Sequence, residues 1–333
     1  MKTKLFIAAA AVAASALLVS CNKTLVIPSE EEPSADFSPA SLTVNIPLGD
    51  ETKAVGTGTE ADEKKLSSVQ VMIFTESGNL EASKTATSGS LELSCTKGSK
   101  TVAAVVNSSE LTGVKTLSEL RARTSSLTDN DFKSFVMYGQ KSVSVNAANV
   151  AVNLEVQRLA SKVVIKKITN AMELQQYQSS PVQVKGIYLI NVAGNTTFAG
   201  TAPTLWLNKM KNEASVDCLY YEKPSGLSIA YKASDAAAHC FYCYPNPTAD
   251  DNSQTSWSAR HTRLVVEATV GGHLCYYPMT LPTLAGNTVY TIGELTITRL
   301  GVDKPDVDSV MGGATFTLSI APWKEETVES VTI

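Results

Sequence analysis

The residues of this sequence that are best suited to chemistry lie in the run 239–243, His-Cys-Phe-Tyr-Cys, whose two cysteines have the spacing of a metal-ligand or redox pair. A zinc site would need two further ligands at matching spacing, and a thioredoxin-like motif would need a surrounding βαβ pattern. Neither accompanies this run. The other histidines, His261 and His273, leave a general base or a metal few candidates. We therefore expect a loop disulfide or buried thiols here, with no metal and no cofactor.

The disulfide pattern stays open at this level. Apart from Cys21, an odd number of cysteines remains, so they cannot all pair and at most two intrachain disulfides can form. Buried thiols are an equal alternative. The cysteines concerned are Cys95, Cys218, Cys240, Cys243 and Cys275.

Other patterns typical of ion binding or catalysis are incomplete or missing. Asp303, Asp306 and Asp308 could suggest calcium, but their spacing is not that of an EF-hand loop, and Pro305 interrupts them. We interpret this segment as a solvated hairpin loop. The Gly-x-Ser-x-Gly pattern of a serine hydrolase does not occur. The sequence therefore assigns no catalytic residue, and we expect a protein that is not an enzyme.

The first residues have the pattern of an export signal. Two lysines precede an apolar run, 5–19, which is shorter than the about 20 residues that a membrane-spanning helix needs. The small residue Ser20 stands directly before Cys21, as is typical of a bacterial lipoprotein signal. We predict a lipoprotein signal peptide over 1–20 and lipidation of Cys21. An ordinary secretory signal that contains a cysteine is the alternative.

The next segment, 21–39, is polar and carries three glutamates between two prolines. Such a composition cannot bury a core, so we predict an acidic tether. The whole chain has a net charge of -4 and scattered lysines and arginines, which makes nucleic acid an unexpected partner. No second apolar stretch approaches membrane-spanning length, so membrane attachment is expected through lipid at Cys21.

Beyond the tether, apolar and polar residues alternate in short runs that are rich in Val, Ile, Thr and Tyr. Clusters of Gly, Pro, Asn and Ser separate the runs, which is typical of antiparallel β-sandwiches. A helix is expected at 117–125, with a candidate continuation at 131–136. The predicted strands are 42–46, 69–74, 91–95, 101–106, 143–145, 150–156, 162–168, 184–192, 264–270, 274–279, 289–298 and 316–320.

The length allows two domains of ordinary size after the tether. We predict an N-terminal β-sandwich over 40–157 and a C-terminal one over 158–333, with a boundary near Arg158. The stretch 203–254 has weak periodicity and several prolines. We interpret it as an insertion or a pair of long loops in the second domain.

Several segments, by their order and spacing, resemble the fimbrillins, a family of major fimbrial subunits. The resemblance covers most of the first predicted domain and both ends of the second, while the middle diverges. The run 51–56, Glu-Thr-Lys-Ala-Val-Gly, follows the first predicted strand, and Trp323 stands in the place of the family's C-terminal tryptophan. The segments are the lipoprotein pattern at Cys21, then 42–46, 51–56, 66–74, 98–107, 117–120, 158–163 and 316–323.

The resemblance implies an all-β type V pilus subunit with two transthyretin-like β-sandwich domains. It also implies delivery to the outer membrane as a lipoprotein precursor, followed by incorporation into an extracellular fimbrium with other fimbrial subunits. In the family, an extracellular trypsin-like protease cuts the loop after the first strand, which by position falls between Lys53 and Ala54. The family's best-known site has Arg there, so the identity of the protease is open. The alternative is that Lys53 is a solvated loop residue.

A physical argument independent of the family supports strand exchange. If 42–46 is a strand of the first sandwich, a cut after Lys53 frees it together with the lipid. Its neighbours then expose a row of unpaired backbone groups and a groove for apolar side chains, which is a template for another strand. The inward residues of this removable strand are Leu42, Val44 and Ile46.

The replacing strand is expected from the C-terminal segment 316–333 of a neighbouring subunit. Residues 327–333 are β-prone, although neither face of this segment is strongly apolar. The candidate donor residues are Val328, Val331 and Ile333. We expect a polymerising subunit that supports adhesion.

A glycan-binding surface lipoprotein is the rival interpretation. It would share the export signal, the acidic tether and the β-sandwiches, and it would need a platform of aromatic side chains for sugar stacking. The divergent region supplies Trp206, Tyr220, Tyr221, Tyr242, Tyr244 and Trp257.

Overall fold

The computed structural model describes residues 37–47, 63, 65–209, 218–248, 257–307, 314–323 and 329–331. Asp36–Ile333 form one compact unit. The predicted signal peptide, Cys21 and the candidate cut between Lys53 and Ala54 lie outside the described residues. No helix in the described ranges is long and apolar enough to cross a membrane.

The described part of residues 37–158 builds two sheets with an apolar core between them. Its elements are β1 (Pro39–Asn45), β2 (Val69–Thr75), β3 (Leu80–Ala86), β4 (Ser90–Thr96), β5 (Gly98–Val106), α2 (Leu117–Ala122), β6 (Thr124–Ser126), the 3-10 turn η1 (Leu127–Asp129), β7 (Met137–Val145), β8 (Asn149–Asn153) and β9 (Gln157–Arg158). One sheet has the order β4-β1-β8 and the other β3-β2-β5-β7-β9. Leu42 and Leu93 of the first sheet share a buried cluster with Val71 and Ala104 of the second, so the two sheets form a sandwich.

The rest of the chain builds a second pair of sheets. Its elements are β10 (Ser161–Ile165), β11 (Ile168–Asn170), α3 (Gln175–Gln178), β12 (Val182–Ile190), β13 (Val192–Ala193), β14 (Asn195–Thr197), β15 (Trp206–Leu207), β16 (Tyr221–Glu222), β17 (Ser228–Ile229), β18 (Ser234–Asp235), β19 (His239–Cys243), β20 (Arg263–Val270), β21 (His273–Thr280), β22 (Thr288–Ile297), β23 (Ala314–Pro322) and β24 (Glu329–Val331). One sheet runs β18-β11-β22-β10-β19, with β23 on β22 and β24 on β23, and the other runs β16-β12-β20-β21, with β17 on β12. Val163 and Ile292 of the first sheet pack with Ile187 and Val266 of the second. The predicted all-β fold class, with little helix, is confirmed.

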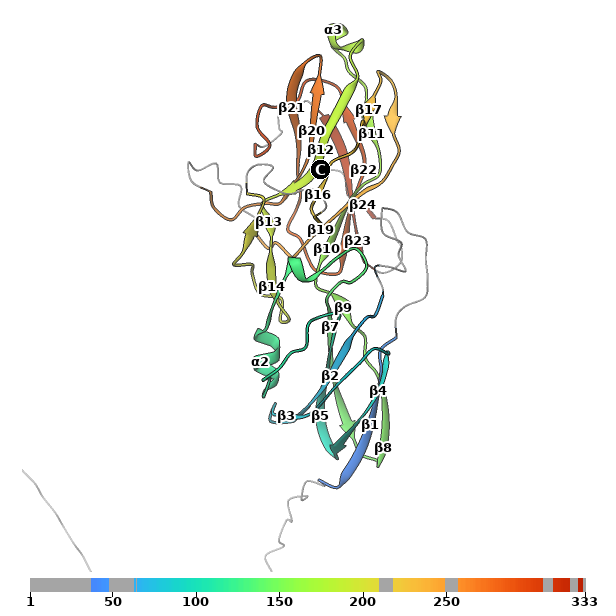
Figure 1. Ribbon diagram of the computed structural model, residues 1–333, viewed down its shortest axis with the longest axis vertical. Helices are drawn as coiled ribbons and strands as arrows, with labels where there is room; N and C mark the ends of the chain where they lie inside the picture. Colours follow the sequence, from blue (N-terminus) through green and yellow to red (C-terminus); the bar gives the residue numbers. More distant parts are fainter. Residues whose placement is uncertain are drawn as a thin grey trace, which may run out of the picture. The chain divides into compact units, whose positions relative to one another are not determined.

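Three strand pairs depart from the expected antiparallel arrangement. β1 pairs with β8 in parallel, and β22 pairs in parallel with both β10 and β11. The direction of a strand relative to its neighbours depends on long connections, so the alternation of residues within a strand cannot reveal it. Figure 1 shows β1, in blue, beside β4 and β8.

The predicted helix at 117–125 is present but shorter. In α2, the Thr116 side chain accepts a hydrogen bond from the backbone N–H of Glu119, and the Glu119 carboxylate accepts one from the N–H of Thr116. This capping box starts the helix where the sequence predicts it. The last predicted residues are strand instead, because β6 pairs with β14. That partner lies too far along the chain for a local pattern to indicate it.

The candidate helical continuation at 131–136 is wrong. Asp131 and Ser134 form an isolated antiparallel bridge, and the Asn130 side chain accepts a hydrogen bond from the backbone N–H of Val136. Phe135 and Val136 are fully buried in this loop. Side-chain hydrogen bonds of Asn compete with the helical ladder and favour the turn.

The interpretation of 203–254 as an insertion or a pair of long loops stays a prediction, and the described residues of this stretch include strands. Its described residues contain the short strands β15 to β18 and the five-residue strand β19. β19 pairs with β10 and all of its residues are buried. In a strand that is buried on both faces, apolar and polar residues do not alternate. The two-residue pattern that predicts a strand is therefore missing from its sequence.

The sequence also gave no sign of β3. This strand pairs with β2 at the edge of its sheet, and its residues are exposed or half-buried. An edge strand with little apolar surface lacks the two-residue pattern on which the prediction depends.

The predicted domain boundary near Arg158 stays a prediction. Asp36–Ile333 form one unit, and β6 pairs with β14 across that point in the chain. The other strand pairs connect elements on the same side of Arg158.

Candidate functional site

The predicted removable strand lies inside a sheet. β1 pairs antiparallel with β4 from Pro39 to Asn45, and it pairs in parallel with β8 from Ser41 to Asn45. Its burial alternates along the strand, with Leu42 and Val44 at 0% exposure. Ile46, directly after the strand, is 5% exposed. The alternation in sequence thus corresponds to an inward face that fills the core of the first sandwich.

Removing β1 would expose one edge of β4, one edge of β8 and an apolar groove between them. The backbone groups of β4 and β8 that now bond to β1 would lose their partners. The four inward side chains of the strand region, Ala40, Leu42, Val44 and Ile46, would leave their cluster. At about 1.5 to 3 kcal/mol for each large apolar side chain, the burial lost is on the order of 5 to 10 kcal/mol. A vacancy of this kind favours any strand that can fill it.

A cysteine lies beside this strand. Cys95 of β4 is opposite Ala40 of β1, is 7% exposed and belongs to the same core cluster. Burial raises the pKa of the Cys95 thiol, and the charge of Glu81 raises it further. Its reactivity is therefore tied to the presence of β1.

The C-terminal segment lies in the other sandwich. β23 pairs with β22 along most of its length, and β24 pairs with β23 through three residue pairs, Leu318 with Val331, Ser319 with Ser330, and Ile320 with Glu329. Within the described residues, β24 has β23 as its one strand neighbour. Of the candidate donor residues, Val331 is in β24, whereas Val328 and Ile333 lie outside the described residues.

A buried polar cluster joins the chain before β2 to the end of β23. We call it the Glu63 clamp, and it consists of Glu63, Arg158, Lys162, Tyr242 and Trp323. The Glu63 carboxylate accepts hydrogen bonds from Lys162 Nζ at 2.7 Å, Tyr242 Oη at 2.6 Å and Trp323 Nε1 at 3.1 Å. Its backbone carbonyl accepts one from Arg158 Nε at 3.1 Å. Glu63 is 1% exposed, so these donors replace the water that its charge would otherwise need.

The Trp323 ring is held on several sides in this clamp. It stacks on Tyr242 with ring centroids 5.7 Å apart, and Phe135 meets it edge-on at 5.4 Å. The Arg158 guanidinium lies 4.6 Å from the ring centroid. Burial, aided by the Glu63 charge, raises the pKa of Tyr242, so its hydroxyl keeps the proton that it donates.

Sequence reasoning missed the role of Glu63. The residue is separated from Lys162 by 99 positions and from Trp323 by 260 positions along the chain. A signal was present only for Trp323, through the family resemblance. No local pattern marks one glutamate in a polar connecting segment as buried.

The run 239–243 forms the buried strand β19. His239 Nδ1 contacts Glu222 at 2.9 Å, and Nε2 contacts Asp235 at 3.0 Å. Burial lowers the pKa of His239, but the hydrogen bonds to Glu222 and Asp235 outweigh it, so the pKa is raised above its ordinary value. Across the described residues, no cluster of three or more His, Cys, Asp or Glu could hold a metal ion.

The five cysteines outside the signal segment are thiols in the described structure. The expected loop disulfide at Cys240 and Cys243 is therefore wrong, and the alternative of buried thiols is correct for this pair. Both side chains lie in the core of the second sandwich. Burial raises the pKa of the Cys243 thiol to about 12.

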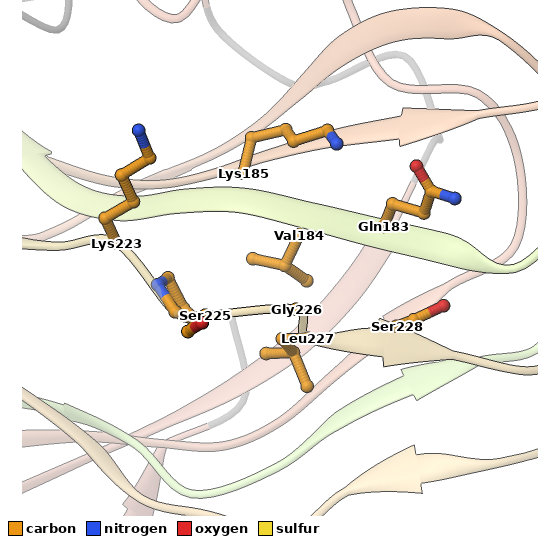
Figure 2. Close-up of a pocket in the computed structure, with 9 residues that line it drawn as sticks. Gln183, Val184, Lys185, Lys223, Ser225, Gly226, Leu227 and Ser228 are labelled. Atoms are coloured by element: carbon orange, nitrogen blue, oxygen red, sulfur yellow. The ribbon is translucent and has the colours of Figure 1, made fainter.

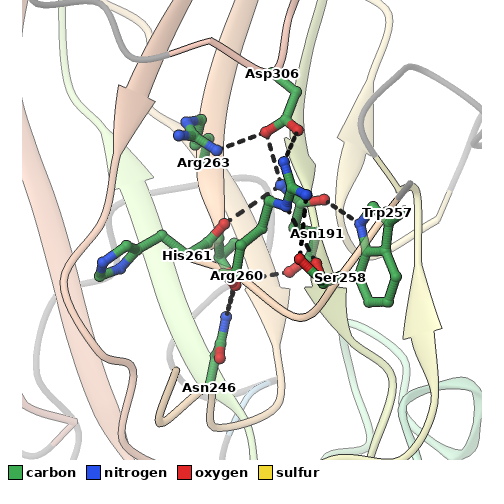
Figure 3. Close-up of polar contacts among 9 residues, drawn as sticks. Asn191, Asn246, Trp257, Ser258, Arg260, His261, Arg263 and Asp306 are labelled. Carbon is green, nitrogen blue, oxygen red and sulfur yellow. Dashed lines mark hydrogen bonds and ion pairs between the residues drawn. The ribbon is translucent and has the colours of Figure 1, made fainter. Parts of the chain in front are cut away.

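The aspartates that suggested a hairpin loop belong in part to a buried ion-pair network. Asp306 accepts from Arg260 Nη1 at 2.9 Å and from Arg263 Nη1 at 2.5 Å, and all three side chains are 3% or 4% exposed. Asn191 Nδ2 also donates to Asp306 at 3.0 Å (Figure 3). The interpretation of a solvated loop is therefore wrong for Asp306. Asp303 is exposed, and Asp308 lies outside the described residues.

The six aromatic residues of the rival interpretation do not share one surface. Tyr242 and Tyr244 are fully buried, and Tyr221 is 9% exposed. Trp206 and Trp257 do lie together, with ring centroids 5.4 Å apart. Trp257 Nε1 is directed to Asn191 (Figure 3), to which it donates at 2.9 Å. A six-residue aromatic platform is therefore excluded.

An open groove of about 520 Å³ lies beside β12, lined by residues 183–185 and 223–228. Figure 2 shows Val184 between β12 and the loop that carries Ser225 to Leu227, with Lys185 and Lys223 extending away from Val184. The groove is in the second sandwich, whereas β1 belongs to the first. It therefore takes no part in the site formed by β1.

Parts of this chain are similar to known proteins in sequence and in structure. A family model described as major fimbrial subunit protein (FimA) matches residues 40–184. A fimbrilin (FimA) from Porphyromonas gingivalis has a similar structure, with a TM-score of 0.62 and 16% sequence identity over 87% of this chain and 98% of that chain. A candidate cell adhesion protein from Bacteroides eggerthii has a TM-score of 0.62 and 18% identity over 86% of this chain and 97% of that chain.

A tip fimbrial protein from Porphyromonas gingivalis is similar with a TM-score of 0.51 and 10% identity, over 86% of this chain and 100% of that chain. No curated protein matches the chain by sequence. The structural similarities show a shared fold, and the family model adds the link in sequence. The resemblance to the fimbrillins is thereby confirmed: residues 40–184 match the family model of the FimA major fimbrial subunit, and the chain has the fold of a solved fimbrilin.

Proposed function

We propose that this chain is a structural subunit of a cell-surface fimbrium that polymerises by strand exchange. The observation that carries the proposal is the place of β1: it is an interior strand with a fully buried apolar face, and it precedes the candidate cut. The FimA family consists of structural fimbrial subunits and is not an enzyme family.

The proposed sequence of events begins with export as a lipoprotein. Lipid on Cys21 holds the precursor at the outer membrane. A trypsin-like protease then cuts between Lys53 and Ala54, and the fragment that contains β1 departs with the lipid. The sandwich loses the strand that separates β4 from β8, and both strands become open edges.

The C-terminal segment of a second subunit is the proposed replacement. Its candidate donor residues Val328, Val331 and Ile333 would enter the places of Leu42, Val44 and Ile46. The three residue pairs that hold β24 to β23 are few, so leaving that edge costs little compared with the backbone bonds regained in the new sheet. Repetition of this exchange yields a homopolymer, to which accessory fimbrial subunits can join and which supports adhesion.

The reactivity of Cys95 provides the test. We expect alkylation of Cys95 to be slow in the intact precursor, fast after cleavage and removal of the fragment, and slow again in polymers, because β1 or its replacement covers the thiol. Mass spectrometry of the labelled peptides measures all three states. Cys218, which is half-buried and lies in the other half of the chain, is the internal control and should not change.

A Cys95 thiol that stays protected after the fragment has been removed would mean that β1 does not complete this core. Equal labelling in cleaved monomers and polymers would mean that no strand replaces it.

The Trp206 and Trp257 pair supports a second candidate function, glycan binding. Lys209 Nζ lies 4.6 Å from the centroid of the Trp257 ring, so the Lys209 ammonium makes a cation–π contact with this ring. A glycan array with the mature protein and with a Trp206→Ala variant tests this alternative. Binding that depends on Trp206 would support it.

A further inference from the structure

The Glu63 clamp joins two parts of the chain. Under strand exchange, the first part follows the cut and stays with its subunit, whereas the second directly precedes the segment that would leave. Glu63 belongs to the segment after the candidate cut, so it stays with the subunit when β1 departs. Trp323 directly follows β23 and precedes the candidate donor residues. The clamp thus connects Glu63, near the new N-terminus that the cut would create, with Trp323, the last residue before the candidate donor segment.

Trp323 is fixed by its backbone as well as by its ring. Its N–H donates to the carbonyl of Asn287 at 2.7 Å, and its carbonyl accepts from Arg158 Nη1 at 3.3 Å. Moving Trp323 would break these bonds, expose a buried indole and remove one donor from the buried Glu63 carboxylate. An incompletely paired buried charge is costly, so motion should begin after this residue.

The retained side of the cut is secured close to Glu63. The Asn107 side chain donates to the carbonyl of Lys65 at 2.7 Å and accepts from the backbone N–H of Ser67 at 2.8 Å. These bonds do not involve β1. The donors to Glu63 also lie outside β1, so the departure of the first strand breaks none of these hydrogen bonds directly.

We propose that the Glu63 clamp sets the point at which the exchanging segment begins, so that residues 324–333 leave while β23 stays paired with β22. This inference rests on the proposed function and assigns Glu63 and Trp323 as positioning residues. When extended, residues 324–333 would span roughly 33 to 36 Å. The seven residues of β1 occupy about 24 Å, so this segment is long enough to replace them.

Two engineered disulfides distinguish the moving part from the fixed part. Ile320→Cys with Glu329→Cys ties β24 to β23, and Thr288→Cys with Pro322→Cys ties the end of β23 to β22, each at a paired position in the register. Directly opposed antiparallel residues have Cα atoms about 4.5 to 5.5 Å apart, which suits a disulfide. Both pairs are made in a Cys95→Ser, Cys218→Ser chain, because Cys95 loses its cover when β1 departs and Cys218 is half-buried, so either thiol could form a wrong disulfide.

Polymerisation of the cleaved full-length chain is then followed by light scattering and electron microscopy, oxidised and reduced. We expect the oxidised 320–329 pair to arrest polymerisation and the reduced form to restore it. The oxidised 288–322 pair should polymerise as well as its reduced form. Arrest by both disulfides overturns the clamp inference but leaves a C-terminal donor in place. Polymerisation with the oxidised 320–329 pair overturns the C-terminal donor itself.

Hydrogen exchange tests the two positioning residues directly. Trp323→Phe keeps an aromatic ring but removes the Nε1 donor to Glu63, and Glu63→Ala removes the carboxylate. We expect amide exchange in 314–323 to become about tenfold faster in each variant, because a hydrogen bond to a charged group is lost. Amides of β12 serve as the control and should not change. Unchanged exchange in 314–323 would show that the clamp does not hold β23.

Discussion

Several single ionisable residues are buried in this molecule together with the groups that pair with them. The buried charges of Glu63 and Asp306 are each surrounded by donors, and His239 lies between two carboxylates. Removing a partner from any of these groups would leave a buried polar atom unsatisfied, which costs stability.

His239 gives the clearest prediction for pH. Its pKa in the folded chain is raised above the ordinary 6.5, so the stabilisation is fully present below about pH 6.5 and is lost as pH rises through the folded pKa. Urea unfolding between pH 6 and 9 measures the free energy of unfolding. The wild type should lose stability with rising pH relative to a His239→Gln variant, in which Glu222 and Asp235 keep their charges.

Parallel stability curves for the two proteins would show that the raised pKa of His239 does not contribute. A steeper fall in the variant would mean that the sign is reversed.

At the scale of elements, β1 has two opposite requirements. It must complete the core of the precursor, and under the proposed function it must also be dispensable. Its alternation satisfies the first requirement through Leu42 and Val44. Its place at the N-terminal side of the candidate cut satisfies the second, because one cut separates it from the other strands of the sandwich.

Leu42→Ala should therefore act on the precursor alone. We expect a loss of about 2 to 5 kcal/mol in the free energy of unfolding of the uncut protein, because a fully buried leucine is replaced by a smaller side chain. Thr43→Ala, on the half-buried opposite face, is the matched control and should cost less than 1 kcal/mol, roughly. Denaturant unfolding measures both.

Polymers that form from cleaved Leu42→Ala protein should be as stable as those of the wild type. Weakened polymers would indicate that β1 remains in the fimbrium, contrary to the proposal.

At the scale of the whole molecule, the first sandwich holds the candidate removable strand and the second holds the candidate donor. Each subunit would thus offer an acceptor groove at one sandwich and a strand at the other. This head-to-tail arrangement generates an open polymer and not a closed dimer.

Under the proposed function, the cut after Lys53 links these two roles. We expect Lys53→Gln to block maturation, because a trypsin-like protease needs a basic residue before the cut, and the uncut lipoprotein should remain with the outer membrane. Lys65→Gln, in the same connecting segment, is the matched control and should be processed normally. Mass spectrometry of surface-extracted protein identifies the first residue, which should be Ala54 in the wild type and in the control. An unchanged first residue in Lys53→Gln would remove Lys53 from the mechanism.

The sequence by itself determined the all-β class, most of the long strands, the inward face of β1 and the start of α2. These features depend on neighbours a few residues apart: Leu42, Val44 and Ile46 alternate with polar residues, and Thr116 caps the N–H of Glu119. Tertiary structure alone decided the parallel partner of β1, the burial of β19, the ion pairs of Asp306 and the contact between Glu63 and Trp323. Each of these joins residues that are far apart in the chain, so its energy depends on the folded arrangement of both partners and leaves no periodic trace in either segment.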